Sequence, residues 1–191
     1  MKILITGTRE SGKDAILDLV LEGSRKLLPR FEYSRFHDIM KKSLPKERDV
    51  IRKATSFDNF NAKQISDIKS NFEKNAIAEF TRLAKSQNLI ISGYFTIRAK
   101  QGYIPLISEK FFKKFSPDVI INLEMRAPDK PKPKDMPEIA GILKHQETNR
   151  IMAVSLATLT GTTVKTIKVR HGNIKYALKE LSKTLEYHLG R

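Results

Sequence analysis

The chain has 191 residues, of which 40% are hydrophobic and 30% charged, so it is long enough and apolar enough to fold as one ordinary α/β domain with a buried core. It contains no cysteine, which excludes disulfides, thiolate zinc sites and a cysteine nucleophile. Its 36 Lys and Arg residues against 21 Asp and Glu residues give a net charge of +15, which favours polyanionic partners: nucleotides, nucleic acid or acidic membrane surfaces. A basic surface that serves only solubility is the other interpretation of this charge.

No apolar run approaches the roughly 18 residues that a membrane-spanning helix needs. Residues 1–7, Met-Lys-Ile-Leu-Ile-Thr-Gly, contain an apolar stretch that is too short for a signal peptide and that predicts a buried strand. We therefore expect a cytoplasmic protein without a membrane partner.

Short apolar runs alternate with longer segments of helical periodicity, which predicts a mostly parallel sheet covered by helices. The predicted strands, in chain order, are Ile3–Ile5, Phe31–Ser34, Leu89–Ser92, Val119–Leu123 and Val164–Val169. The predicted helices are Lys13–Leu28, Asp38–Ser43, Ile65–Lys85, Glu138–Thr160 and Asn173–Tyr187. Two stretches are expected to be irregular: the polar Ser56–Lys63, and Ala127–Pro137, whose four prolines disfavour a regular helix. No repeat or linker divides the chain, so a single domain over residues 1–191 is expected.

The first predicted strand is followed by the stretch Gly7-Thr8-Arg9-Glu10-Ser11-Gly12-Lys13-Asp14, where a predicted helix begins. This stretch fits the phosphate-loop pattern G-x-x-x-x-G-K at Gly7, Gly12 and Lys13. In such loops backbone N–H groups and the helix N-terminus hold phosphate oxygens, the lysine neutralises the outer phosphates, and a following Ser or Thr hydroxyl holds magnesium. The strand–loop–helix context predicts that the segment descends from a phosphate-binding loop.

Two carboxylates distinguish this loop: Glu10 lies within it, and Asp14 stands where the pattern has Ser or Thr. Both bring negative charge to the place that a triphosphate would occupy. Asp14 also lies in the first helical turn, where the helix dipole favours a carboxylate, and either group could pair with Lys13. Direct coordination of magnesium by Asp14 is a further option, which its repulsion of phosphate opposes. We favour a loop that is neutralised internally over one that binds triphosphate well, and we assign no metal ligand.

Further segments follow in a consistent order: Gly102-Tyr103-Ile104-Pro105, then residues 116–124 (Ser-Pro-Asp-Val-Ile-Ile-Asn-Leu-Glu), then His145-Gln146 with Asn149-Arg150, then residues 157–165 (Ala-Thr-Leu-Thr-Gly-Thr-Thr-Val-Lys). With the loop, they closely resemble the archaeal type of adenylate kinase over nearly the whole chain. The resemblance implies a three-layer α/β P-loop fold with a five-stranded parallel sheet. It also implies a monophosphate-binding insertion at residues 35–63, a short lid rich in Pro and Lys at residues 126–137, and the reaction ATP + AMP ⇌ 2 ADP with magnesium.

By position, the resemblance implies nucleotide-binding roles for Gly7, Gly12, Lys13, Arg48, Arg52, Arg98 and Arg150. Lys13 would contact the transferring phosphates, whereas Arg48 and Arg52 match an arginine pair near the monophosphate. If the activity survives, Lys13 and Arg150 are the catalytic candidates, and Mg with ATP and AMP are the cofactor and substrates.

The chain departs from the family pattern where the chemistry takes place. The family has glycine at the position of Glu10 and Ser or Thr at that of Asp14. Its third strand ends in Asp-Thr-His, with the aspartate near magnesium, where this chain has Ser92-Gly93-Tyr94. Its lid carries several arginines, whereas residues 126–134 here carry one Arg and three Lys. Lysine lacks the guanidinium fork, and an arginine at the transferring phosphoryl group is worth about 10³–10⁵ in rate, so we expect phosphoryl transfer to be lost or weak.

Three functions fit these observations. The first is an adenylate-kinase-like protein with little catalysis whose basic surface binds RNA or a ribonucleoprotein such as the ribosome. The second is an active nucleoside monophosphate kinase, and the third is a regulatory or structural protein that binds AMP or another nucleotide without cleaving ATP. For the first, the nucleic-acid-binding candidates are Lys110, Lys113, Lys114, Lys130, Lys132, Lys134, Lys165, Lys168, Arg170 and Lys175.

Aromatic residues near Arg98 have two interpretations. Tyr94, Phe95 and Tyr103 could stack on nucleic-acid bases, or they pack at an edge of the sheet. His145 is expected to be a structural histidine, although its place in the family segment could bring it to the site.

Overall fold

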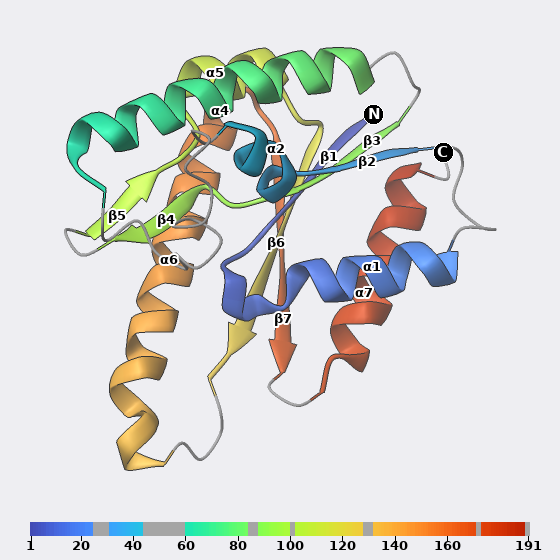
Figure 1. Cartoon of the computed structure of the whole chain (residues 1–191). Coiled ribbons are helices and arrows are strands. Elements are labelled where there is room, and N and C mark those ends of the chain that lie inside the picture. The colour runs from blue at the N-terminus through green and yellow to red at the C-terminus, as the bar shows by residue number, and fades with distance from the viewer. Residues whose placement is uncertain are drawn as a thin grey trace.

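Five parallel strands form the centre of the molecule in a computed structural model that describes residues 1–24, 31–43, 60–83, 88–99, 102–127, 132–170 and 173–189 (Figure 1). Their spatial order is β2-β3-β1-β6-β7. The strands are β1 (Lys2–Thr6), β2 (Glu32–Arg35), β3 (Leu89–Gly93), β6 (Val119–Arg126) and β7 (Thr163–Arg170). At the carboxyl edge of the sheet, Thr6 of β1 pairs in register with Gly93 of β3 and with Asn122 of β6. The expected five-stranded parallel sheet is thus confirmed.

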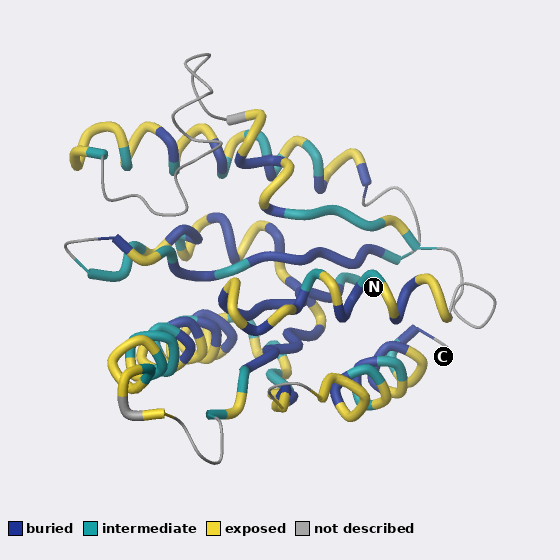
Figure 2. The backbone as a smooth tube through the Cα atoms, turned by 60° about the horizontal axis from the view of Figure 1, so that its bottom comes forward, coloured by how far each residue is buried: buried dark blue, intermediate teal, exposed yellow. Residues whose placement is uncertain are grey.

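Helices cover both faces of this sheet, which makes the fold a three-layer α/β structure as predicted. One face packs on α1 (Lys13–Ser24) and α7 (Lys175–Leu189). The other face packs on α2 (Phe36–Ser43), α4 (Ala62–Leu83), α5 (Glu109–Phe115) and α6 (Met136–Thr158). Figure 2 shows the result: the central strands are buried along most of their length, whereas the helices alternate between buried and exposed residues.

The layers follow from the alternation of side chains along each strand. In β1, Ile3 and Ile5 point toward α1 and α7, whereas Leu4 belongs to the core on the opposite face. In the three central strands, the buried polar residues Thr6, Ser92, Asn122 and Glu124 lie toward the carboxyl ends, and apolar residues precede them. The candidate site therefore lies at the carboxyl edge of this apolar centre of the sheet.

An aromatic cluster forms the core beneath α2 and α4. The Phe36 ring is fully buried and lies 5.1 Å from the Phe72 ring, 6.0 Å from the Phe80 ring and 6.4 Å from the Phe111 ring, measured between centroids. A Cβ atom at Gly93 would come within 2.4 Å of the Phe36 ring, so the end of β3 needs glycine for packing. This cluster joins β3, α2, α4 and α5 into one unit.

The structure differs from the predicted elements in several places. An antiparallel hairpin of β4 (Thr96–Ala99) and β5 (Gly102–Pro105) was not predicted, because its four-residue strands have little alternation to identify them. The proline-rich stretch expected to be irregular contains the short 3-10 helix η2 (Pro133–Asp135) and the start of α6, since proline is tolerated in the first helical turn. Strand β6 continues three residues beyond its predicted end, because β7 pairs with it as far as Arg126.

Truncating the central ring of the aromatic cluster should cost substantial stability. We expect Phe36→Ala to lower the free energy of unfolding by about 3–5 kcal/mol, because the site is fully buried and its rigid neighbours leave a cavity. Leu19→Ala is the control, since Leu19 is 49% exposed and should cost less than about 1 kcal/mol. Urea unfolding followed by circular dichroism measures both, and equal effects would contradict the assignment of Phe36 to the core.

Candidate phosphate-binding site

The phosphate-loop segment connects β1 to α1 through a single 3-10 turn, η1 (Arg9–Ser11). Gly7 has φ +154°, and a Cβ atom there would lie 2.5 Å from the Leu123 carbonyl oxygen and 2.6 Å from Ser11 Oγ. Gly12 has φ +65°, in the left-handed region, and ends the turn immediately before α1. Both predicted glycines are therefore required by the loop geometry, Gly7 for close approach to β6 and Gly12 for its backbone conformation.

Part of the loop's hydrogen-bonding capacity is used internally. The Ser11 and Gly12 N–H groups donate to the Thr8 and Arg9 carbonyl oxygens over 3.1 and 3.3 Å, and Ser11 Oγ donates to the Thr8 carbonyl oxygen over 2.7 Å. By contrast, the Thr8 hydroxyl is buried and has no hydrogen-bond partner among the residues that the structure describes. The loop thus keeps the overall path of a phosphate loop while two of its N–H groups point to its own carbonyls.

Lys13, at the start of α1, is buried and forms an ion pair with the next residue. Its side chain is 5% exposed, and Nζ donates to Asp14 Oδ2 over 2.9 Å. Nζ also lies 5.7 Å from the centroid of the Tyr94 ring at the end of β3. A buried ammonium needs a compensating charge, and here Asp14 supplies it. Of the two carboxylates considered from the sequence, it is Asp14 that pairs with Lys13, whereas Glu10 is exposed.

Asp14 is the polar centre of the site because it pairs with Lys13 and links α1 to β3. Its second oxygen, Oδ1, accepts a hydrogen bond from the Ser92 hydroxyl of β3. Burial raises the pKa of the Asp14 carboxyl, but the Lys13 charge and the hydrogen bonds from Ser92 and Lys13 outweigh it, so the pKa lies below its ordinary value of 3.8. The Asp14 side chain is still 46% exposed, which leaves it accessible from solvent.

Other side chains act on this carboxylate or respond to it, and one of them, Arg35, was not identified from the sequence. Arg35, at the end of β2, donates to Asp18 Oδ1 over 2.5 Å and to the Tyr33 hydroxyl over 2.9 Å, and its charge also acts on Asp14. Burial raises the pKa of the Tyr94 hydroxyl to about 12, and the Asp14 charge adds to the rise. Burial, aided by the Lys41 charge, lowers the pKa of His37. Arg35 could have been noticed in the sequence because it directly follows a predicted strand.

Two buried amides of α6 fasten that helix to the carboxyl edge of the sheet. Asn149 Nδ2 donates to Thr6 Oγ1 over 3.2 Å, and its Oδ1 accepts from the Phe95 N–H over 2.8 Å. Gln146 accepts from the Met125 N–H over 2.5 Å and donates to the Met125 carbonyl oxygen over 3.1 Å. In the His-Gln-x-x-Asn-Arg segment, Gln and Asn therefore have a structural role. Each forms hydrogen bonds with backbone or hydroxyl groups near the carboxyl ends of the strands.

Arg150, predicted as a catalytic residue, lies beside the amides and faces Glu124 at the end of β6. The Arg150 Nε atom is 3.5 Å from Glu124 Oε1, and the Arg150 side chain is 44% exposed. The Glu124 side chain is only 6% exposed; it also accepts from Lys168 of β7 and from Asn122 Nδ2, the latter over 2.9 Å. Arg150 and Lys13 thus both lie at the carboxyl edge of the sheet, each with a carboxylate partner.

The hairpin β4–β5 lies against α6 and carries the remaining described candidate, Arg98. The Tyr103 and His145 rings stack, with centroids 5.1 Å apart and planes at 15°, and His145 Nε2 donates to the Thr96 carbonyl oxygen over 3.3 Å. Burial lowers the pKa of His145, with smaller opposing effects from Thr96 and Glu10. Arg98 is exposed near Gly141, about two and a half turns of α6 before Arg150. Phe95 is buried, so of the three aromatics it is a packing residue.

Some predicted residues lie outside the described part of the chain: Arg48 and Arg52, expected in a monophosphate-binding insertion, and Lys130, expected in a lid. The other nucleic-acid candidates fall at two ends of the sheet. Lys110, Lys113 and Lys114 lie on α5, which leads into the amino end of β6. The rest follow the carboxyl ends of β6 and β7, or lie along β7: Lys132, Lys134, Lys165, Lys168, Arg170 and Lys175. Since β6 spans about 25 Å, the lysines of α5 and the residues at the carboxyl ends of the strands are two groups and not one surface.

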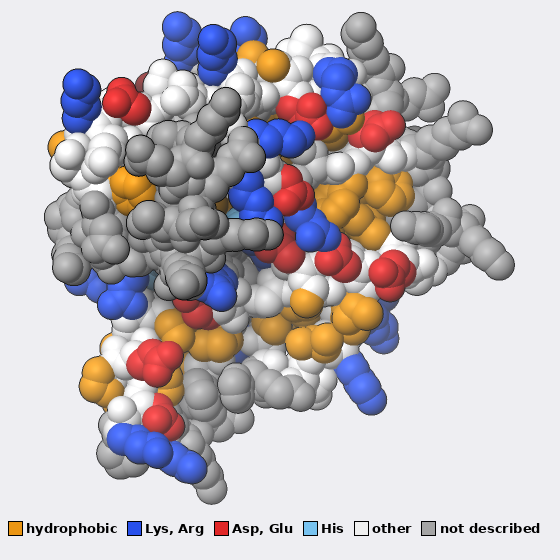
Figure 3. Space-filling view, viewed as in Figure 1, with side chains coloured by type: hydrophobic (Ala, Val, Ile, Leu, Met, Phe, Trp, Pro, Cys, Tyr) orange, Lys and Arg blue, Asp and Glu red, His pale blue; other side chains and the backbone are white. Residues whose placement is uncertain are grey.

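Carboxylates neutralise part of these two groups. Lys113 pairs with Glu109 at 2.6 Å, Lys165 with Glu180 at 3.9 Å, and Lys168 with the buried Glu124. On the face drawn in Figure 3, Lys and Arg side chains are interleaved with acidic and apolar ones and form no continuous basic patch. On this face the basic side chains are therefore scattered and do not gather into one surface.

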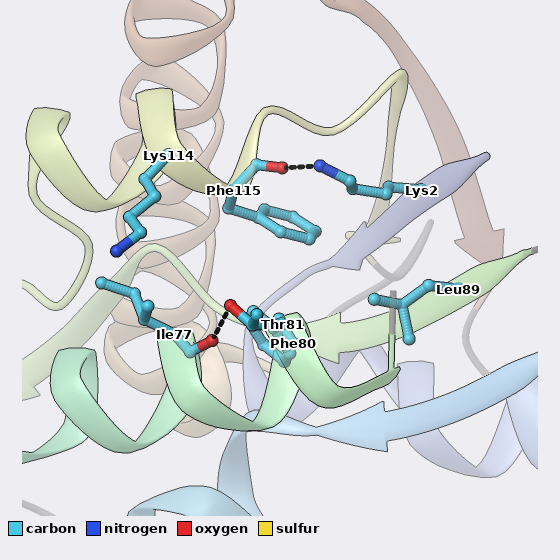
Figure 4. A pocket seen from close by; sticks show the side chains of 7 residues that line it. All are labelled: Lys2, Ile77, Phe80, Thr81, Leu89, Lys114 and Phe115. Atoms are coloured by element: carbon cyan, nitrogen blue, oxygen red, sulfur yellow. Dashed lines mark hydrogen bonds between the residues drawn. The ribbon is translucent and has the colours of Figure 1, made fainter. Parts of the chain in front are cut away.

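A small cavity of about 70 Å³ lies at the opposite, amino edge of the sheet, between α4, α5 and the starts of β1 and β3 (Figure 4). Lys2 Nζ donates to the Phe115 carbonyl oxygen over 2.6 Å there and so caps the end of α5. Ile77, Phe80 and Leu89 supply apolar walls. The cavity is separated from the phosphate loop by the length of β1 and takes no part in the site.

A buried lysine that follows a glycine-bounded loop, placed between the first strand of a parallel sheet and a helix, defines a P-loop protein of nucleotide-kinase architecture. Residues 11–130 match a family model described as an AAA domain, which is more than half of the chain. The chain belongs to this P-loop family and, within it, is a member of the adenylate kinase family.

Relatives of near-equal length support this assignment. The chain is 25% identical to an adenylate kinase from Thermoplasma acidophilum over 193 residues, which cover 97% of this chain and 98% of the relative. It is 27% identical to an adenylate kinase from Methanocaldococcus jannaschii over 180 residues, covering 90% and 88% of the two chains. The fold is similar to that of a thymidylate kinase from Ehrlichia chaffeensis, with a TM-score of 0.54, 13% identity, and coverage of 97% and 98%. In the described part of the chain, no helix is long and apolar enough to cross a membrane.

The lowered pKa of Asp14 predicts how stability responds to acid. Because the folded-state pKa lies below the unfolded value near 3.8, Asp14 contributes stability that is fully present above that pH and is lost as the pH falls through the folded pKa. Asp14→Asn should therefore unfold with a flatter acid limb than the wild type between about pH 5 and pH 2. Urea unfolding across this range measures the difference, and Glu22→Gln, at an exposed site of the same helix, should retain the wild-type slope.

Proposed function

We propose that this protein binds nucleotide phosphates at the loop between β1 and α1 but transfers phosphoryl groups slowly. The observation that carries the proposal is the ion pair between Lys13 Nζ and Asp14 Oδ2, 2.9 Å apart. The lysine that would neutralise outer phosphates is already neutralised, and the carboxylate that neutralises it would repel them. The internal bonds of the Ser11 and Gly12 N–H groups support the same conclusion.

The lid composition supports slow transfer independently of the loop. Lys132 and Lys134 are exposed lysines before α6, where a rapid kinase would need arginines to stabilise the charge of the phosphoryl group in flight. We further propose that residues 35–63, with Arg48 and Arg52, receive a nucleoside monophosphate such as AMP, and that residues 126–137 act as the lid. Arg98 and Arg150 would then contribute to phosphate binding.

Magnesium is the cation expected in a P-loop site, and the residues present fit it. Mg²⁺ prefers carboxylate, hydroxyl and phosphate oxygens and is commonly held by one or two carboxylates together with substrate phosphates. Asp14 and Ser92 offer a carboxylate and a hydroxyl side by side. Among the described residues no three His, Asp or Glu side chains gather into a metal cluster, so water molecules or phosphate oxygens would have to complete the coordination of a cation held by Asp14 and Ser92. Bound there, magnesium would neutralise charge on the phosphate oxygens.

Slow turnover is the direct test of this proposal. Purified protein given ATP, AMP and Mg²⁺ should form ADP with a kcat below about 0.1 per second, against roughly 1–100 per second for typical kinases, because both loop and lid lack charges aimed at the phosphoryl group. Coupled ADP detection measures the rate, and Lys13→Ala is the control that removes any activity belonging to this loop. A rate within the typical range that Lys13→Ala abolishes would establish an active nucleoside monophosphate kinase instead.

RNA binding is a second candidate function, and one group of basic residues favours it. Lys132, Lys134, Arg170 and Lys175 are exposed at the carboxyl edge of the sheet and have no carboxylate partner among the described residues. Unpaired cations grouped at one edge are the residues that would release counterions from nucleic-acid phosphates. The group on α5 is a weaker candidate, since Lys113 already pairs with Glu109.

The RNA candidate predicts a specific dependence on salt. For single-stranded RNA, the logarithm of the binding constant should fall linearly with the logarithm of salt, by about 0.7 per phosphate neutralised. Reversing three charges with Lys132→Glu, Lys134→Glu and Arg170→Glu should flatten that slope by about 2. The matched control reverses Lys110, Lys113 and Lys114 on α5 and should leave the slope unchanged. Absence of salt-dependent retention on RNA would exclude this function.

A further inference from the structure

We infer that Asp14 and Ser92 form the protein's half of a divalent-cation site in which the carboxylate and the hydroxyl have exchanged places. In P-loop proteins the cation is usually held by a hydroxyl of the loop's first helical residues and by an aspartate at the end of a neighbouring strand. Here the loop position carries the carboxylate, Asp14, and the end of the adjacent strand β3 carries the hydroxyl, Ser92. This inference rests on the proposed phosphate site and concerns its cation.

The contact between the two side chains carries the argument. Ser92 Oγ donates to Asp14 Oδ1, although the residues are 78 positions apart in the chain. Ser92 is buried at the end of β3, next to β1 in the sheet, whereas Asp14 is 46% exposed and accessible to a cation. A carboxylate and a hydroxyl therefore meet beside the loop. The usual arrangement supplies the same two groups, but with the hydroxyl on the helix and the carboxylate on the strand.

A second observation points to a ligand in the loop. The Thr8 hydroxyl is buried and has no hydrogen-bond partner among the described residues, so the loop holds a polar group that its own atoms do not satisfy. Buried polar groups without partners are uncommon in folded proteins and call for a specific explanation. Thr8 belongs to the same loop as Asp14, so this polar group lies within the segment that phosphate loops use to hold a ligand.

The exchange also gives the Lys13–Asp14 pair a role beyond neutralisation. In the absence of a cation, Lys13 is the counterion of Asp14. A divalent cation at Asp14 would replace that counterion and leave the Lys13 ammonium available to phosphate oxygens. Nucleotide affinity in this protein should therefore depend strongly on the divalent cation, since one cation both neutralises Asp14 and frees Lys13.

The experiment uses two probes on the full chain: Mn²⁺ alone, followed by electron paramagnetic resonance, and ADP binding by calorimetry in MgCl₂ or in EDTA. Asp14→Ser removes the carboxylate. The double variant Asp14→Ser, Ser92→Asp restores a carboxylate to the site, now at the end of β3. Asp14→Asn is the isosteric alternative to the first variant. Glu22→Gln removes one negative charge from an exposed site on the same helix and is the matched control.

We expect the wild type, the control and the exchanged double variant to bind Mn²⁺, and Asp14→Ser and Asp14→Asn to lose it. Magnesium should strengthen ADP binding to the wild type by at least about tenfold over EDTA, and to Asp14→Ser by less than about twofold. In EDTA, Asp14→Ser should bind ADP more tightly than the wild type, because Lys13 is then free.

The inference is overturned if Asp14→Ser or Asp14→Asn binds Mn²⁺ as the wild type does, if the wild type binds none, or if the folded double variant fails to regain it. Circular dichroism establishes that each variant is folded. Failure of the proposed function would appear separately, as rapid ADP formation or as no nucleotide binding in either buffer. The Mn²⁺ titration decides the cation site in both cases.

Discussion

A single buried positive charge organises the candidate site. The Lys13 side chain is 5% exposed, and an ammonium at that depth requires an anion in contact with it. Asp14 provides that anion and is itself held by Ser92, so the charge of α1 is tied to the end of β3. The low pKa of the Asp14 carboxyl follows from these two contacts, which outweigh the effect of its burial.

Two neutral amide side chains, those of Gln146 and Asn149, fasten α6 to the same edge of the sheet. Asn149 bonds to Thr6 of β1 and to the Phe95 backbone, and Gln146 bonds to both backbone groups of Met125. These bonds hold α6 against the strand ends, and the next residue, Arg150, therefore faces the same edge as Lys13. The hydrogen bonds that satisfy these buried polar groups thus also determine where Arg150 lies.

The adenylate kinase family and the charge of this site together limit what the protein does. The fold places the loop after β1, Lys13 and Arg150 at the carboxyl edge of the sheet, which is where P-loop proteins hold nucleotide phosphates. Yet both cations already have carboxylate partners, Asp14 for Lys13 and Glu124 for Arg150. Nucleotide phosphates would have to compete with these partners, and a divalent cation at Asp14 is the simplest way to change that competition.

The sequence by itself determined the fold and the loop, because strand alternation, helical periodicity and the Gly7, Gly12 and Lys13 spacing are local properties. The sequence also showed that Asp14 departs from the phosphate-loop pattern. It did not show which of Glu10 and Asp14 would pair with Lys13, or that Ser92 would donate a hydrogen bond to Asp14. The hairpin β4–β5, the Asn149 contacts and the Arg150–Glu124 pair likewise emerged only from the tertiary structure. The contacts of Ser92, Asn149 and Arg150 each join segments that are far apart in the chain and that the order of strands in the sheet brings together. Such contacts depend on the packing of the whole fold and not on the residues nearby in the chain, whereas the local hairpin was missed because its short strands show little alternation.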